Sequence, residues 1–189
     1  RMPKPTLAHH VSIIIPNYES LDDIQDCLSS IRKYYDSKQV DIIVVDNASA
    51  LEVRTYLRDQ AVKEFDITYI ENEFNAGFTY AVNQGIKVAK PGSDIVLLNN
   101  DALLTRHALV AMQQLAYQDP NFGLVVPRQV LFANTKTITT HVPFANPSID
   151  CDVNLSQHHK NIHHVPLLHD GERVEISFAP FFCTYLRRE

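Results

Sequence analysis

The chain has 189 residues, of which 45% are hydrophobic, and a formal charge of −5. This length and hydrophobic content suffice for one sizeable core, and the acidic balance without a Lys/Arg stripe argues against nucleic acid as a partner. No apolar run approaches the about 20 residues of a membrane span, and residues 1–10 lack the apolar core of a signal peptide, so we expect a soluble, cytoplasmic protein.

Four short apolar runs predict strands, and polar residues follow each of them. The runs are residues 11–15, 41–45, 67–70 and 95–98. Helical spacing separates them, and the first helix carries on one face Ile24, Cys27, Leu28 and Ile31. The repeated strand-helix order predicts an α/β fold, with a Rossmann-like, mostly parallel sheet flanked by helices. Because Cys27 lies on an apolar face, we expect a reduced core thiol and a reducing compartment.

Local signals predict where the helices begin and end. Ser20 with Asp23, and Ser49 with Glu52, have the spacing of a capping pair at a helix start. Pro91-Gly92 should end the third helix. The inward faces of the second and third helices are predicted to carry Val53, Tyr56, Leu57 and Ala61, and Phe78, Ala81, Val82, Gly85, Ile86 and Ala89. We interpret Gly85 as a residue that lets its helix pack closely.

The run from Ile95 to Asp101 carries the sharpest chemical signal. Its apolar strand ends in Asn99, Asn100 and Asp101. In an open α/β sheet, ligands bind beyond the carboxyl ends of the strands, where a carboxylate can bind a hard divalent cation and leave positions for a diphosphate. The same residue types are also typical of a strand-to-helix turn. Alone, the motif favours the turn, so the functional interpretation depends on the other motifs.

Several segments occur in a fixed order along the chain. They are residues 11–18, 44–49, 75–78 with 83–85, and 97–101, followed by 179–189. This set resembles glycosyltransferase family 2, whose members have the GT-A fold, and within that family it most resembles the rhamnosyltransferase-like branch. The resemblance covers residues 11–130 in order, which is far more specific than any one short motif.

The resemblance implies transfer of a sugar from a nucleotide diphosphate to an acceptor hydroxyl, with inversion. The nucleotide-binding residues that it implies are Pro16, Asn17, Glu19, Asp46, Asn75, Gly77 and Asn100. Asp46 would accept hydrogen bonds from the base or ribose, because an ionised carboxylate is a strong acceptor. A carboxylate in the first turn of a helix explains its position equally well. Gly77 would allow close backbone approach and a positive φ.

The resemblance also implies a metal ion. Asp101 would bind Mg²⁺ or Mn²⁺ bridging the two phosphates, and the cation would offset the charge that grows on the leaving diphosphate. Asn99 stands where the family usually has the first aspartate of an Asp-x-Asp motif, which leaves one carboxylate instead of two. Val82 stands where many relatives carry arginine, which removes a cation that could face the phosphates.

The remaining sequence is less informative. We divide the chain into an N-terminal tail (1–10), a nucleotide-sugar-binding α/β domain (11–130) and an incomplete acceptor-side region (131–189). The last region contains five histidines in a polar segment: His158, His159, His163, His164 and His169. His159 and His163 have helical metal-ligand spacing, but no Cys pair or nearby Glu completes a site, so a solvated loop is the favoured interpretation. We expect a strand at residues 178–182.

In the family that the chain resembles, the general base follows the segment corresponding to residues 186–189. We therefore expect the base beyond Glu189 and interpret the chain as the donor-binding part of a longer enzyme. The surface that the missing part would cover is expected to promote self-association. Its predicted residues are Phe178, Phe181, Phe182 and Tyr185.

Taken together, the motifs predict a metal-dependent glycosyltransferase of polysaccharide biosynthesis. Its expected partners are a UDP- or dTDP-linked sugar and a glycan or lipid-linked acceptor, met in the cytoplasm or at the inner face of the membrane. One alternative is a nucleotide- or glycan-binding module without catalysis, which Asn99 and the missing base favour. Another is a sugar nucleotidyltransferase, which is disfavoured because the loop at residues 16–20 contains neither glycine nor a basic residue.

Overall fold

The computed structural model describes residues 3–127 and 181–188. The chain forms two compact units, residues 1–125 with 181–189 and residues 126–180, and the fold below is that of the first. Residues 181–189 belong to this first unit, and the division into a donor-binding domain and an acceptor-side region stays a prediction. The five histidines between residues 158 and 169 lie outside the described residues.

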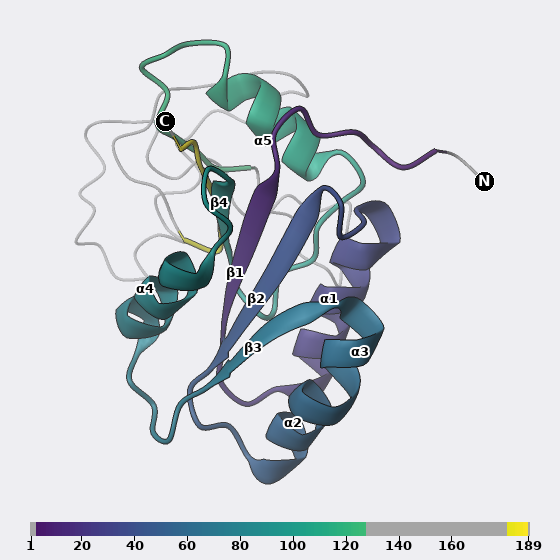
Figure 1. Cartoon of the computed structure of the whole chain (residues 1–189), viewed down its shortest axis with the longest axis vertical. Helices are drawn as coiled ribbons and strands as arrows, with labels where there is room; N and C mark the ends of the chain where they lie inside the picture. Colours follow the sequence, from purple (N-terminus) through teal and green to yellow (C-terminus); the bar gives the residue numbers. More distant parts are fainter. Residues whose placement is uncertain (1–2, 128–180, 189) are drawn as a thin grey trace, which may run out of the picture. The chain divides into compact units, whose positions relative to one another are not determined.

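One sheet organises the first unit, with its described strands in the order β3-β2-β1-β4-β6-β5 (Figure 1). The strands are β1 (Val11–Asn17), β2 (Val40–Asp46), β3 (Ile67–Glu71), β4 (Asp94–Leu98), β5 (Leu124–Val125) and β6 (Cys183–Leu186). β1 pairs in parallel with β2 and β4, and β2 with β3, whereas β6 is antiparallel to both β4 and β5. The predicted α/β class and its four strands are confirmed.

Helices cover both faces of the sheet. They are α1 (Leu21–Tyr34), α2 (Leu51–Tyr56), the π-helical η1 (Leu57–Ala61), α3 (Val62–Phe65), α4 (Phe78–Val88) and α5 (Ala108–Ala116). The buried residues of α1, α2, η1, α3 and α5 join one core cluster, and those of α4 join a second cluster on the opposite face. Figure 1 shows α4 separated from α1, α2 and α3 by the strands.

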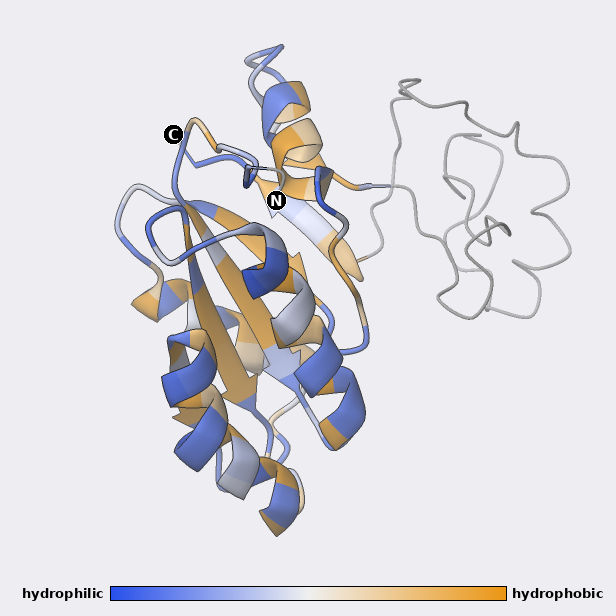
Figure 2. Ribbon diagram, turned by 90° about the vertical axis from the view of Figure 1, so that its right-hand side faces the viewer, coloured by the Kyte–Doolittle hydropathy of each residue, from blue (hydrophilic) through white to orange (hydrophobic). Residues whose placement is uncertain are grey.

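The central strands β1, β2 and β4 carry long apolar runs because both faces of the sheet are covered. Ile13 and Ile15 point into the first cluster and Ile14 into the second, and all three are fully buried. This is why β1 reads as a continuous apolar run instead of an alternating one. Burying each such side chain stabilises the fold by about 1.5–3 kcal/mol. Figure 2 shows the same layering, with hydrophobic strands between helices whose outer faces are hydrophilic.

Gly85 sets how closely α4 approaches the sheet. A Cβ atom added at this position would lie 2.4 Å from Ile14 Cγ2, well inside van der Waals contact. The predicted packing role of Gly85 is therefore confirmed. Ala81 and Val82 of the same helix are buried as predicted, but Phe78 is exposed. The prediction for Phe78 was wrong because it is the first residue of α4, at the edge of the covered face.

Neither predicted capping pair forms the hydrogen bond from a side chain to a backbone N–H that caps a helix start. Ser20 is the N-cap of α1 with a left-handed backbone (φ 54°), and its hydroxyl donates to Asp23 Oδ2 (2.5 Å). The second helix begins at Leu51 with Ala50 as N-cap and no side-chain cap, so the Ser49 prediction was wrong. Its hydroxyl is instead part of the network described below.

Residues 178–180 of the strand expected at 178–182, Phe178 among them, lie outside the described residues. Phe181 and Phe182 form a turn, and β6 starts at Cys183. Tyr185 lies in β6 and is fully buried, which corrects its predicted exposure, whereas Phe181 is exposed. Cys27 and Cys183 are both free and buried, as expected for Cys27.

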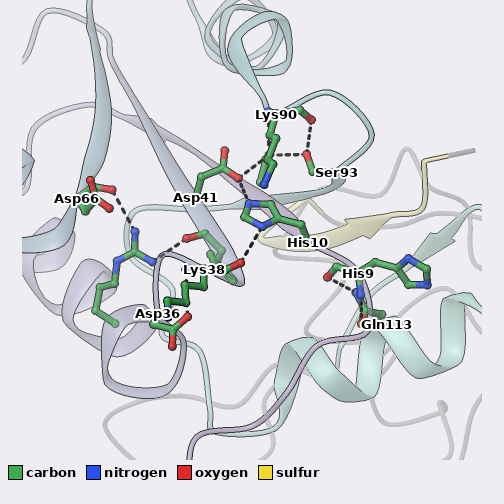
Figure 3. A network of polar contacts seen from close by, with 12 residues as sticks. His9, His10, Asp36, Lys38, Asp41, Asp66, Lys90, Ser93 and Gln113 are labelled. Atoms are coloured by element: carbon green, nitrogen blue, oxygen red, sulfur yellow. Dashed lines mark hydrogen bonds and ion pairs between the residues drawn. The ribbon is translucent and has the colours of Figure 1, made fainter.

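Polar networks lie along the amino edge of the sheet. Next to β1, His10 Nε2 lies 2.5 Å from Asp41 Oδ1, which also accepts from Ser12 Oγ (3.0 Å), and Ser12 Oγ lies 2.5 Å from Ser93 Oγ (Figure 3). The tail leading into β1 is held at this edge too, because the Gln113 side chain accepts from the backbone of residues 8 and 9 (2.7 and 3.2 Å).

The first residue of β4 is a buried carboxylate, Asp94. It accepts hydrogen bonds from the hydroxyls of Tyr185 (2.5 Å) and Tyr117 (3.1 Å) and from Arg188 N (2.8 Å). Desolvation and this carboxylate both raise the pKa of Tyr185. The network fixes α5, β4 and β6 to one another.

Candidate functional site

The carboxyl edge of the sheet places the ends of neighbouring strands side by side. Asn17, Asp46 and Glu71 are the last residues of β1, β2 and β3 and lie opposite one another in the register. β4 joins the same edge, because Ile14, three residues before the end of β1, pairs with Leu97, one residue before the end of β4. In open α/β sheets this is the edge at which ligands bind.

Asp46 is the centre of a buried hydrogen-bond network. Its Oδ1 accepts from Asn17 Nδ2 (2.7 Å) and from Ser49 Oγ (2.5 Å), and its Oδ2 accepts from Ser49 N (3.0 Å). Asp46 is fully buried and Asn17 and Ser49 nearly so. The hydroxyl that was predicted to cap the next helix thus holds this carboxylate instead.

Two further predicted residues join this network. Ser49 Oγ accepts from Glu19 N (2.8 Å), and the Glu19 carboxylate accepts from Ala50 N at 3.1 and 3.2 Å. From the β4 side, Asn100 Nδ2 donates to Asn17 Oδ1 (2.9 Å). Four of the predicted nucleotide-binding residues, on three strand ends, therefore form one connected group.

A second network, which the sequence analysis missed, consists of side-chain amides. Asn72 Nδ2 donates to Asn47 Oδ1 (3.0 Å) and to Gln84 Oε1 (2.9 Å), and Gln84 Nε2 donates back to Asn72 Oδ1 (2.8 Å). Asn47 Nδ2 donates to the carbonyl of Gly77 (3.3 Å). This amide chain joins the ends of β2 and β3 to α4 and supports the loop between residues 72 and 77.

That loop carries the predicted residues Asn75 and Gly77. Gly77 has φ 83°, which side-chain-bearing residues rarely adopt, and its N–H donates to Asn75 Oδ1 (3.0 Å). A Cβ added at Gly77 would meet no atom within 4 Å, so the backbone conformation, and not crowding, requires glycine here. Both residues are exposed, and Gly77 is the residue that precedes α4.

Asp101 lies exposed in the turn that follows β4. Beneath this turn, Cys27 Sγ lies 3.7 Å from the carbonyl oxygen of Asn99, and burial followed by the charges of Cys183 and Asp101 raises the pKa of the Cys27 thiol. Among the described residues, no group of three His, Cys, Asp or Glu side chains could hold a metal. The Asp101 carboxylate is an oxygen donor of the kind that hard cations such as Mg²⁺ prefer.

Two other residues at this edge have different surroundings. Pro16 is half-buried in β1 opposite Val45. Glu71 accepts hydrogen bonds from Arg58 (2.7 Å), Tyr69 (3.1 Å) and Arg54 (3.2 Å), and the Arg58 hydrogen bond is the main cause that lowers the pKa of Glu71. This ion-pair group joins β3 to α2 and η1.

The fold and the polar groups define an α/β protein whose ligand edge lies at the carboxyl ends of parallel strands. The sequence model of glycosyl transferase family 2 matches residues 12–189, nearly the whole chain, and the protein belongs to this family. Among curated proteins, the chain is 29% identical over 126 residues to the low-salt glycan biosynthesis hexosyltransferase Agl10 of Haloferax volcanii. That match covers 65% of this chain and 38% of Agl10.

Solved structures share the fold. The mannosyltransferase PcManGT from Pyrobaculum calidifontis, solved with GDP-Man and Mn²⁺, has a TM-score of 0.56 and 26% identity over 65% of this chain and 36% of its own. S. aureus TarS, solved with UDP-GlcNAc, has a TM-score of 0.56 at 16% identity, over 66% of this chain and 36% of its own, and supports the fold alone.

This chain thus spans little more than a third of the relatives that it matches. The relatives named here are hexosyl- and mannosyltransferases, so membership of the rhamnosyltransferase-like branch stays a prediction. In the described part of the chain, no helix has the length and apolar character needed to cross a membrane.

Proposed function

We propose that this chain binds the donor of a divalent-metal-dependent glycosyltransferase, which moves a sugar from a nucleotide diphosphate to an acceptor hydroxyl with inversion. The observation that carries the proposal is the connected group Asn17, Asp46 and Asn100, with the exposed carboxylate of Asp101 directly after it in sequence. Family membership and the 26%-identical PcManGT, solved with GDP-Man and Mn²⁺, support it.

In this proposal the nucleoside lies over the ends of β1 and β2. Asp46 already accepts three protein hydrogen bonds and is fully buried, so in this proposal it supports the nucleoside site from beneath instead of contacting the base or ribose. Asp46 also fixes the orientation of Asn17, and Pro16, Glu19, Asn75 and Gly77 complete the predicted surroundings of the nucleotide.

The diphosphate lies near Asp101 in this proposal. When bound there, Mg²⁺ or Mn²⁺ would supply electrostatic stabilisation of the leaving diphosphate. With Asn99 in place of a second aspartate, Asp101 supplies the one carboxylate of this motif, so metal and nucleotide should each supply ligands for the other. Asn100 links this turn to the nucleoside side through Asn17.

The donor nucleotide and the acceptor are narrower proposals. The expected donors are UDP- or dTDP-linked sugars, and the solved relatives add GDP-linked mannose as a candidate. A glycan or lipid-linked acceptor and a role in polysaccharide biosynthesis agree with the glycan biosynthesis role in the name of Agl10. The second candidate function, a binding module without catalysis, is favoured by Asn99, which replaces a metal-binding carboxylate.

A thermal-shift screen tests the proposal. Nucleoside diphosphates and their sugars, each with Mn²⁺ or with EDTA, would be added to the chain and to Asp101→Ala. The proposal expects a rise in Tm for one nucleotide class with Mn²⁺ and its loss in Asp101→Ala. Asp59→Ala, which removes an exposed carboxylate from η1, is the matched control and should behave like the parent chain. If no nucleotide raises the Tm of the parent chain, the proposal is wrong.

A further inference from the structure

An exposed pair of aromatic rings lies beside the proposed donor site. The rings of Phe78 and Phe181 are 6.4 Å apart between centroids and tilted by 35°. Their residues are 42% and 46% exposed, although Ala81 in the same helix and Cys183 at the start of β6 are buried. Neither ring belongs to the two core clusters. The pair therefore presents apolar, flat surface outside the core, and core packing does not account for it.

Main-chain contacts place Phe181 next to the turn that contains Asp101. β6 runs antiparallel to β4 with Cys183 opposite Leu98, and Asn99 N donates to the carbonyl of Phe182 (2.9 Å). Phe181 directly precedes Phe182 and therefore lies beside the turn after β4. Phe78 follows Gly77, whose carbonyl accepts from an amide of the second polar network. The two rings thus come from two different segments, and a hydrogen bond to the neighbouring residue holds each segment in place.

The order of the strands gives the order of the ligand parts. β2 and β1 carry Asp46 and Asn17, β4 leads to Asp101, and β6 follows Phe181, in the sheet order β2-β1-β4-β6. Neighbouring strands lie about 4.8 Å apart, so β1 and β6 are separated by about 10 Å. A nucleotide sugar has the same linear order, because the diphosphate lies between nucleoside and sugar. With the nucleoside at β1 and β2 and the diphosphate at β4, the sugar falls at β6.

We propose that Phe78 and Phe181 form a stacking platform for the hexose ring of the donor. This inference rests on the proposed donor-binding function. A hexose presents a face of C–H groups, which packs on an aromatic ring, while its hydroxyls point outward and stay hydrogen-bonded to water or polar side chains. The nucleobase, the other flat group of the donor, belongs with Asp46 at the opposite end of the strand order.

Calorimetric titration with Mn²⁺ tests the platform with three pairs of ligands: UDP and UDP-GlcNAc, dTDP and dTDP-glucose, and GDP and GDP-mannose. The readout is the ratio of Kd for the nucleotide sugar to Kd for its own diphosphate. In Phe181→Leu and Phe78→Leu, which keep apolar volume but remove the flat ring, this ratio should rise about tenfold, the size of a lost aromatic contact. The diphosphate Kd should change less than twofold.

Two variants control for indirect effects. Val88→Ala removes an exposed apolar side chain from the far end of α4 and should leave the ratio unchanged. Phe181→Trp should retain tight sugar binding. Because the chain contains no other tryptophan, this variant also introduces a single tryptophan as a fluorescent probe. Its emission should change with the nucleotide sugar and much less with the diphosphate.

The outcomes separate the two proposals. If the parent chain binds diphosphates and the leucine variants keep the parental ratio, the platform is wrong and the donor-binding function stands. If both variants weaken diphosphate and nucleotide sugar equally, the rings act on the nucleotide or on the fold, and the platform is again wrong. If the parent chain binds none of the UDP, dTDP and GDP ligands, the donor-binding function fails and the platform fails with it.

Discussion

The two edges of the sheet both carry buried polar networks, but they differ in what they leave exposed. At the amino edge, Asp94 accepts from Tyr185, Tyr117 and Arg188 N, and the His10–Asp41 pair is tied to β1 by Ser12. At the carboxyl edge, the network around the buried Asp46 is continued by loops whose outermost residues are exposed.

The difference indicates how each edge is used. The amino-edge carboxylate Asp94 is buried among groups from α5, β4 and β6, so its hydrogen bonds serve the fold. At the carboxyl edge the outermost polar residues, Asn75 and Asp101, are exposed and lie on loops. A buried network that supports exposed polar groups is the arrangement that a preorganised binding site requires. Substitutions at the two edges should therefore affect different measurements.

The largest effect on stability is expected at the amino edge. Asp94→Ala leaves the buried Tyr185 hydroxyl, and the part-buried Tyr117 hydroxyl and Arg188 N–H, without their acceptor, which should lower the free energy of unfolding by about 3 kcal/mol. Urea denaturation followed by circular dichroism measures this loss. Nucleotide affinity of the folded fraction should stay at the parental value. A loss of affinity without a loss of stability would reverse the assignment of the two edges.

At the carboxyl edge, Asp46→Asn should weaken nucleotide binding by about 1.5–3 kcal/mol, the range for a hydrogen bond to a charged group. Because Asp46 is fully buried and bonded to Ser49 and Asn17, this variant should lower stability as well. Calorimetric Kd and a urea midpoint measured on the same preparation separate the two effects. Parental affinity in a folded Asp46→Asn protein would show that Asp46 serves the fold alone, like Asp94.

Gln84 offers a smaller effect at the same edge. Gln84→Ala removes one end of the amide chain and should loosen the loop that carries Asn75 and Gly77, weakening nucleotide binding by about 1 kcal/mol. Glu52→Ala, an exposed polar residue on α2, is a control that should not change Kd. Titration of both variants with the nucleotide found in the thermal-shift screen gives the comparison. Equal Kd values for the two would mean that the amide chain does not support the binding loop.

The smallest effect is expected from thiol reagents. Burial raises the pKa of Cys183 to about 12, and burial is also the main cause that raises the pKa of Cys27. Because the thiolate is the reactive form, native Cys27 and Cys183 should resist iodoacetamide at pH 8 and react readily in urea. Peptide mass spectrometry after alkylation distinguishes the sites. Rapid native labelling of Cys27 would mean that the turn above it opens to solvent.

Local sequence patterns were enough to predict much of this fold. The apolar runs and the buried face of α1 were predicted because both depend on periodicity within one element. The convergence of Asn17, Asp46 and Asn100 followed from placing polar residues at the ends of parallel strands. Their roles toward a nucleotide remain predictions.

Other features depend on contacts between distant segments and could not be predicted in this way. Ser49 has capping-box spacing, but it bonds to Asp46 because the strand end lies next to it in three dimensions. The amide chain joins residues 12 to 25 positions apart, which no local pattern contains. Phe78 follows the helical period, yet the period does not show that the first turn of α4 extends past the covered face.

The coupling between Mn²⁺ and nucleotide tests the central claim most directly. The Kd values of UDP, dTDP and GDP would be measured with Mn²⁺ and with EDTA, in the parent chain, Asp101→Ala and Asp59→Ala. We predict that Mn²⁺ tightens binding of one nucleotide at least about tenfold in the parent and in Asp59→Ala, a coupling of about 1.4 kcal/mol, and that Asp101→Ala abolishes this gain. A nucleotide Kd that is the same with Mn²⁺ and with EDTA, or a tightening by Mn²⁺ that persists in Asp101→Ala, would contradict the account.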